Sequence, residues 1–149
     1  MSDVNVSFRH LQRVKPTLDT PFYISYDWWT KSGRDIRIEF LSHLCPEHRA
    51  IYADHFATEL VDWVDPKTGE VTRVDGLQHI IREHCSRQAG YIDSQLSLVD
   101  AVFRVFLVNG NVPLSPRELA SVAGRPADTI LRTLAGRTTY KGLRPAVKD

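Results

Sequence analysis

Residues 115–136, "SPRELASVAGRPADTILRTLAG", constrain the fold more than any other stretch of the sequence. Ser115 stands where a helix N-cap is preferred, a proline follows it, and Glu118 completes the spacing of a capping box. Gly124 predicts the end of this helix, and the chain restarts with a second proline and reaches another stop at Gly136. The pattern predicts two short helices joined by a tight glycine turn, which is the spacing of a helix-turn-helix.

The segments on either side of this pair extend the pattern. Residues 97–111, "SLVDAVFRVFLVNGN", open with Ser97 and Asp100 at the spacing of a capping box, continue with apolar residues and stop at a glycine. They predict a longer helix ahead of the pair. Residues 137–147, "RTTYKGLRPAV", predict a small β-hairpin that turns at a Lys-Gly step.

A helix, two short helices and a basic hairpin in this order resemble a winged-helix domain, and the resemblance covers residues 93–149. In DNA-binding members of that superfamily the second short helix enters the major groove, which implies that residues 125–136 are a recognition helix. Arginine and threonine can address base edges or phosphates, and a basic hairpin contacts backbone phosphates. The implied nucleic-acid contacts are Arg125, Thr129, Arg132 and Thr133 on the helix and Arg137, Tyr140, Lys141 and Arg144 on the hairpin.

The charge of the chain is distributed unevenly. Residues 100–149 carry 8 Lys/Arg and 4 Asp/Glu, a net of +4, whereas residues 1–99 carry 11 and 14, a net of −3. A positive C-terminal part favours a polyanionic partner such as double-stranded DNA, although an uneven solvated surface gives the same count. Winged helices also serve as protein-interaction modules, so the sequence leaves a protein partner open.

The N-terminal half predicts strands and short helices. Residues 22–29, "FYISYDWW", are rich in strand-forming aromatic residues, and residues 35–41, "DIRIEFL", alternate apolar and charged side chains, so the two predict a β-hairpin. Residues 59–76 predict a second hairpin around a "DPKTGE" turn. Residues 46–60 and 75–88 have helical character.

Cysteines and histidines in this half suggest a metal site. Cys45 and His48 form one pair, and His79, His84 and Cys85 lie about thirty residues further on. Thiolate and imidazole are ordinary ligands of tetrahedral Zn²⁺, so we expect a structural zinc ion that ties the two segments together. The alternative is two buried thiols that behave as small apolar groups, with imidazoles on the surface.

Helix geometry limits which of these residues can bind one ion together. His79 and Cys85 would lie about 120° apart around an ideal helix, and the neighbours His84 and Cys85 about 100° apart. The expected ligand set is therefore Cys45, His48 and Cys85, with either His84 or His79 as the fourth ligand.

Catalytic readings have less support in the sequence. Cys45 with His48 could act as nucleophile and base, and a hydrolytic metal site could use Glu47 or Glu83 as a general base. The sequence has no phosphate loop, dinucleotide fingerprint or kinase signature. We expect a protein without enzymatic activity, and a metal-dependent hydrolase is the third alternative.

Together these features predict an α+β protein in three parts. Residues 1–21 form an irregular arm, residues 22–92 an α+β domain with the candidate metal site, and residues 93–149 the winged-helix-like domain. The N-terminus lacks a secretion signal and no apolar run approaches a membrane span, so a cytoplasmic location is expected. The expected function is nucleic-acid binding or transcription-associated regulation, and the runner-up is a protein–protein adaptor.

Overall fold

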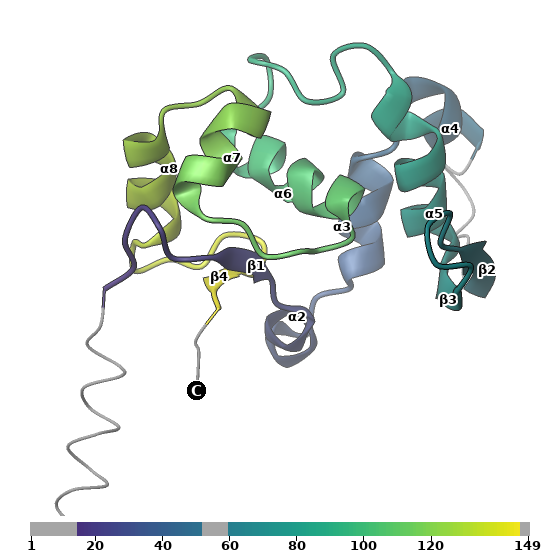
Figure 1. Ribbon diagram of the computed structural model, residues 1–149, viewed down its shortest axis with the longest axis horizontal. Coiled ribbons are helices and arrows are strands. Elements are labelled where there is room, and N and C mark those ends of the chain that lie inside the picture. The colour runs from purple at the N-terminus through teal and green to yellow at the C-terminus, as the bar shows by residue number, and fades with distance from the viewer. Residues whose placement is uncertain (1–14, 52–59, 147–149) are drawn as a thin grey trace, which may run out of the picture.

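The computed structural model describes residues 15–51 and 60–146. In chain order the elements are β1 (Phe22–Ile24), α2 (Tyr26–Ser32), α3 (Ile36–Ser42), α4 (Pro46–Ile51), β2 (Leu60–Val64), β3 (Val71–Asp75), α5 (Gly76–Glu83), a 3-10 helix (Cys85–Arg87), α6 (Leu98–Asn109), α7 (Pro116–Ala123), α8 (Ala127–Leu134) and β4 (Leu143–Pro145). Helices with two small antiparallel sheets make an α+β fold, as predicted. Figure 1 places α6 centrally, with α7 and α8 toward one end of the long axis and α4, α5 and the β2–β3 hairpin toward the other.

The three C-terminal helices begin and end where the sequence predicts. The Ser97 side chain accepts a hydrogen bond from the Asp100 backbone at the start of α6. Ser115 and Glu118 form both bonds of the capping box at the start of α7. Gly124 ends α7 in the left-handed conformation, with φ of 67°, and so allows the chain to turn directly into α8.

The hairpin predicted over residues 137–147 is wrong. β4 pairs with β1, with Phe22 opposite Pro145 and Ile24 opposite Leu143. Phe22 also forms an isolated antiparallel bridge with Leu114, in the loop between α6 and α7, so β1 lies between Leu114 and β4. Phe22 and Ile24 are fully buried, and this burial explains why a distant strand takes the place beside β4 that a local hairpin would fill.

The hairpin predicted over residues 22–29 and 35–41 is also wrong, because only the first three of these residues form a strand. The Ser25 side chain accepts a hydrogen bond from the Trp28 backbone and so begins α2. Gly33 ends α2 with φ of 73°. These two caps convert an aromatic stretch with strand propensity into a short helix.

The alternating segment that follows forms α3 rather than a strand. The Asp35 side chain caps the helix by accepting a hydrogen bond from the Arg37 backbone. Phe40 is buried, whereas the Ile38 side chain is 60% exposed, so the apolar residues do not share the single face that a strand would give them. Packing of one helical face against the core therefore prevails over the period-two pattern.

The second hairpin and the two flanking helices agree with the sequence. β2 and β3 pair antiparallel from Leu60 with Asp75 to Val64 with Val71. Asp65 closes the turn by accepting a hydrogen bond from the Lys67 backbone. α4 begins at Pro46 as expected, and the rest of the predicted segment 46–60 lies largely outside the described residues. α5 is shorter than predicted and ends at Glu83.

One cluster of buried apolar side chains draws on both halves of the chain. α6 supplies the largest share, including Val102, Phe103 and Phe106, and residues from β1, α3 and α5 pack with it. The β1–β4 pair also crosses the predicted boundary at residue 93. No helix among the described residues has the length and apolar character needed to cross a bilayer.

Candidate functional site

Cys45, His48 and Cys85 form a compact cluster between α4 and the 3-10 helix. The Cys45 Sγ atom lies 3.3 Å from His48 Nδ1, and Cys85 Sγ lies 3.9 Å from the same nitrogen. The three ligand atoms all lie within 4.8 Å of one another, which is close enough to bind a metal ion. The sequence-predicted core of the metal site is therefore assembled in the fold, from residues that lie up to 40 positions apart.

The two thiols lie in the interior. The exposed fraction is 4% for Cys45 and 0% for Cys85, and the Cys45 backbone N–H donates to Cys85 Sγ at 3.2 Å. Burial raises the pKa of the Cys85 thiol to about 11, so this thiol is protonated at neutral pH unless a cation displaces the proton. This environment suits a structural ligand better than a nucleophile.

His84 and Glu47 lie at the exposed side of this cluster. The His48 and His84 ring centroids are 4.2 Å apart, with the rings edge to face at 73°. His84 Nε2 lies 3.4 Å from a Glu47 carboxylate oxygen. Glu47, His48 and His84 also form a group of ligand atoms within 4.8 Å, so His48 belongs to two adjoining groups of donors.

His79, the other predicted fourth ligand, lies apart from the cluster. It is in the middle of α5, and no group of three close metal-binding side chains among the described residues includes it. Its Nδ1 atom is buried without a hydrogen-bond partner in the part of the chain that the structure describes. The fold brings Cys45, His48 and Cys85 together, places His84 beside His48 and leaves His79 outside.

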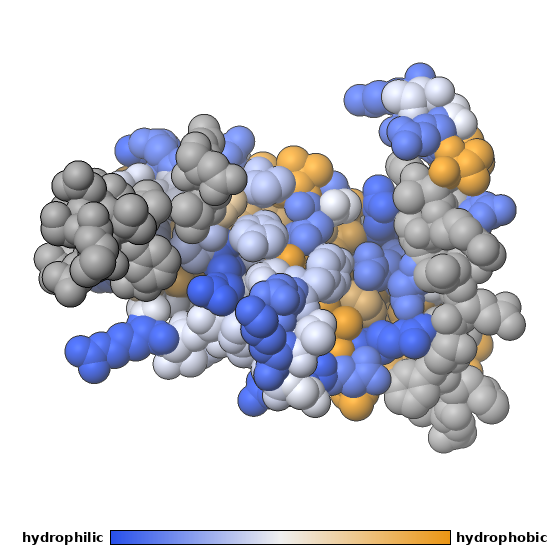
Figure 2. All heavy atoms as spheres, turned by 90° about the horizontal axis from the view of Figure 1, so that it is seen from below, coloured by the Kyte–Doolittle hydropathy of each residue, from blue (hydrophilic) through white to orange (hydrophobic). Residues whose placement is uncertain are grey.

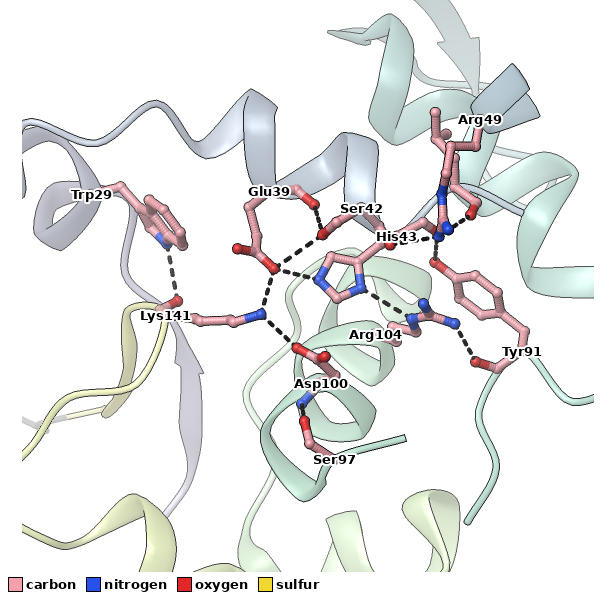
Figure 3. Close-up of polar contacts among 11 residues, drawn as sticks. Trp29, Glu39, Ser42, His43, Arg49, Tyr91, Ser97, Asp100, Arg104 and Lys141 are labelled. Atoms are coloured by element: carbon pink, nitrogen blue, oxygen red, sulfur yellow. Dashed lines mark hydrogen bonds and ion pairs between the residues drawn. The ribbon is translucent and has the colours of Figure 1, made fainter. Parts of the chain in front are cut away.

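A partly buried ionic network, which sequence reasoning missed, links α3 to α6 and to the segment after α8 (Figure 3). Lys141 Nζ lies 2.6 Å from a Glu39 carboxylate oxygen and 2.6 Å from an Asp100 carboxylate oxygen. His43 Nε2 lies 2.7 Å from the same Glu39 oxygen, and Arg104 Nε donates to His43 Nδ1 at 3.0 Å. No local pattern could reveal the network, because Glu39 and Lys141 are 102 residues apart.

The network fixes the charge states of its members. Burial raises the pKa of Glu39, but hydrogen bonds from His43 and Lys141 and the Lys141 charge outweigh it and bring the pKa down to about 2. Burial lowers the pKa of His43. Because Arg104 donates to Nδ1, we assign the His43 proton to Nε2 of a neutral ring. Glu39, His43 and Asp100 could hold a cation, but the Lys141 ammonium already lies between the two carboxylates.

The backbone around Lys141 is also fixed by hydrogen bonds to α2 and to the residue that caps it. Trp29 Nε1 donates to the Lys141 carbonyl at 3.0 Å, and the Ser25 N–H donates to the Gly142 carbonyl at 2.7 Å. A Cβ atom on Gly142 would lie 2.7 Å from Trp29 Nε1. The Lys141 charge is therefore paired with two carboxylates within the fold, on a segment that does not form the predicted hairpin.

Arg125, Thr129 and Thr133 also make internal contacts. Arg125 Nη2 donates to the carbonyls of Asp93 and Leu96, at 3.1 and 2.5 Å, and so fastens the start of α8 to the loop before α6. The Thr133 hydroxyl donates to the Thr129 carbonyl within α8 at 2.9 Å. Arg125 is a positioning residue of the helix pair in this fold, and both threonines are half-buried.

The remaining predicted contacts reach solvent. Arg132, Arg137 and Arg144 are exposed, and the Tyr140 side chain is 43% exposed. Within the described ranges, none of these three arginines forms an ion pair with Asp or Glu. Ile130 is buried in the core.

The chain was compared with known proteins at the level of sequence and of structure. No family model, curated protein or solved structure matches it. Two regions of the fold are candidates for function: the Cys45, His48 and Cys85 cluster, and the solvent-facing side of α8.

Proposed function

We propose that the protein binds double-stranded DNA through a winged-helix-type unit in which α8 enters the major groove. Support comes from the α6, α7 and α8 order and from the glycine turn that separates α7 from α8. Helix spacing places Asp128, Arg132 and Ala135 on one face of α8, and all three are exposed. Arg132 is thus the principal candidate for a base-edge or phosphate contact.

One observation carries this proposal: Arg132, Arg137 and Arg144 are solvent-exposed and without an ion-pair partner among the described residues. The other well-described basic side chains of this region are engaged, since Arg117 pairs with Asp19 and Lys141 with Glu39. Exposed guanidinium groups that are not neutralised internally are suited to phosphate oxygens.

The revised set of DNA contacts is smaller than the sequence implied. Lys141 holds the fold together and Arg125 positions α8, so neither is expected to touch DNA directly. Arg137 and Arg144, from the segment predicted as the wing, remain as the proposed source of backbone contacts. The face seen in Figure 2 combines hydrophilic side chains with smaller apolar patches.

Fluorescence anisotropy with a labelled random-sequence duplex at low salt tests the proposal. Wild-type protein is expected to bind, and Arg132→Ala is expected to bind more weakly by about 1–3 kcal/mol. Lys67→Ala, which removes an exposed charge from the β2–β3 turn, is the matched control and should bind like the wild type. Absence of binding to any duplex at low salt would refute the proposal.

We also propose that the ion bound by Cys45, His48 and Cys85 is Zn²⁺ in a structural role. Thiolates with imidazole are a normal zinc ligand set, and the buried thiols lie on segments 40 residues apart that an ion would hold together. Elemental analysis of protein purified without chelator should find about one zinc per chain. Cys45→Ser should reduce that content, and a metal-free wild-type protein would contradict the assignment.

A protein partner is the second candidate, because several apolar side chains are exposed on the half of the molecule away from α8. Their exposed fractions are 55–60% for Ile38, Ile51, Val64 and Val71. An interface built on such residues survives moderate salt, whereas phosphate contacts weaken steeply. The salt dependence of any binding therefore separates the two functions.

A further inference from the structure

We propose that His84 is the fourth ligand and closes the metal centre as a tetrahedral Cys2His2 site. This inference rests on the proposed zinc site and adds the identity of its fourth ligand. A closed site has no open position for water, so the centre would be structural, and metal-dependent hydrolysis would be excluded. The identity of the fourth ligand thus decides between two classes of function.

The first argument is the position of His84 relative to His48. The two ring centroids are 4.2 Å apart, and the same His48 ring has Cys45 Sγ 3.3 Å and Cys85 Sγ 3.9 Å from its Nδ1 atom. The three other members of the proposed set therefore all lie against one imidazole. The His84 ligand atom is grouped with those of Glu47 and His48 and not with the two thiols, so its side chain, which is 46% exposed, has to rotate to reach the ion.

The second argument is the backbone at the end of α5. Adjacent residues on a continuous helix would point about 100° apart, which disfavours His84 and Cys85 as joint ligands. α5 ends at Glu83, and His84 has φ of −129° and ψ of −59°, outside the helical region. The break frees His84 and Cys85 from helical geometry, and both approach His48.

The third argument is the contact between His84 and Glu47. His84 Nε2 lies 3.4 Å from a Glu47 carboxylate oxygen. Metal-bound histidines commonly donate their other ring N–H to a carboxylate, which fixes the tautomer and the ring orientation. The Gln88 side-chain nitrogen lies 3.4 Å from the same Nε2 atom, so Glu47 and Gln88 both face this nitrogen and leave Nδ1 as the ligand atom.

Metal binding at this site would also stabilise α4. The described helix α4 has no buried side chain. Arg49 Nη2 holds it to the nearby carbonyls of Ser42 and Leu44, and it meets the segment after α5 through His48 and Glu47, which lie beside Cys85 and His84. His48 is the ligand on this helix. When Zn²⁺ binds, the two thiol protons leave to solvent and two Zn–S bonds form, so that α4 becomes fastened to the 3-10 helix.

Cobalt substitution of the full chain tests the fourth ligand. Co²⁺ added to metal-free wild-type protein should give the intense visible d–d bands of a tetrahedral centre with sulfur charge-transfer bands. His84→Ala should shift the d–d bands and make them respond to added imidazole, because an open position is created. His79→Ala, five residues earlier in α5, is the control and should leave the spectrum unchanged.

Two more variants keep the outcome decisive. His84→Cys should restore a four-coordinate spectrum and raise the charge-transfer intensity by about half, because three thiolates bind instead of two. Glu47→Gln should weaken cobalt affinity by about 10-fold without changing the band pattern, as expected for a carboxylate that only orients His84.

The contrary results are separable. If wild-type protein gives no tetrahedral cobalt spectrum, the proposed metal site is refuted, and the assignment of His84 as its fourth ligand is refuted as well. If Cys45→Ser abolishes the spectrum while His84→Ala leaves it unchanged, the metal site stands and the assignment of His84 is overturned. If Glu47→Gln alone shifts the d–d bands as ligand loss does, Glu47 is the fourth ligand instead.

Discussion

Lys141 and Glu39 form a 2.6 Å ion pair that fastens the segment after α8 to α3. The ammonium group is shared with Asp100 on α6, so one side chain joins three parts of the chain. This arrangement explains why residues 137–147 do not form a free hairpin, because their central residue is held inward by two carboxylates. The recognition surface of the proposed DNA-binding unit is therefore restricted to α8 and the exposed arginines that follow it.

Replacement of Lys141 by Met should destabilise the fold. The variant leaves the Glu39 and Asp100 carboxylates without their shared cation, and we expect a loss of about 2 kcal/mol in the free energy of unfolding. That value allows for the 30% of the Lys141 side chain that is exposed. Lys31→Met is the control, since Lys31 is 78% exposed and its change should be below about 0.5 kcal/mol. Urea denaturation monitored by circular dichroism measures both, and equal losses would contradict the role of the network.

Acid should weaken the fold through Glu39. Its pKa is about 2 in the folded protein and near 4.5 otherwise, so the unfolded chain binds more protons between these values. Stability from this group is complete above about pH 5 and is lost as the pH falls toward 2. The free-energy difference between wild type and Glu39→Gln should be about 2 kcal/mol at pH 7 and should shrink toward pH 2. Glu70→Gln in the exposed β2–β3 turn should show no such trend.

Gly142→Ala should cost more stability than Gly69→Ala. Both glycines have positive φ, 77° and 72°, so both variants share the backbone strain of a left-handed alanine. A Cβ atom at Gly142 would also lie 2.7 Å from Trp29 Nε1, whereas nothing lies within 4 Å at Gly69. We expect Gly142→Ala to exceed its control by about 2 kcal/mol in denaturant unfolding. Similar losses of unfolding free energy for the two variants would contradict this, because they would show that the Trp29 side chain moves aside at little cost.

Removal of metal should loosen α4 while leaving α7 and α8 intact. α4 has no buried side chain, so it depends on the ion more than helices that pack on the core. Hydrogen exchange should quicken for residues 46–51 when zinc is chelated, and zinc should restore protection. The capping box and buried face of α7 predict unchanged exchange there. Exchange that changes equally in both helices would indicate global unfolding instead.

The sequence predicted the elements whose signals are local. The Ser115 and Glu118 capping box, the stop at Gly124 and the turn at Asp65 act within a few residues, and each was confirmed. The grouping of Cys45, His48 and Cys85 could also be predicted from the sequence. Cys45 and His48 lie close together in the chain, and zinc chemistry favours other cysteines and histidines as their partners.

The sequence could not predict features decided by distant packing. The alternation around Ile38 fits a strand as well as a helix, and only the burial of Phe40 against the core selects α3. The pairing of β1 with β4 joins opposite ends of the chain. The network around Lys141 likewise depends on partners 41 and 102 residues away. Such contacts leave no periodic trace in the sequence.

The salt dependence of duplex DNA binding tests the central claim most directly. If Arg132, Arg137 and Arg144 contact phosphates, the logarithm of the association constant should fall with the logarithm of salt concentration with a slope of about −3. Arg132→Ala should make that slope less steep by about 1, and Lys67→Ala should leave it unchanged. A wild-type slope near zero, or a slope that Arg132→Ala does not alter, would contradict DNA binding through α8.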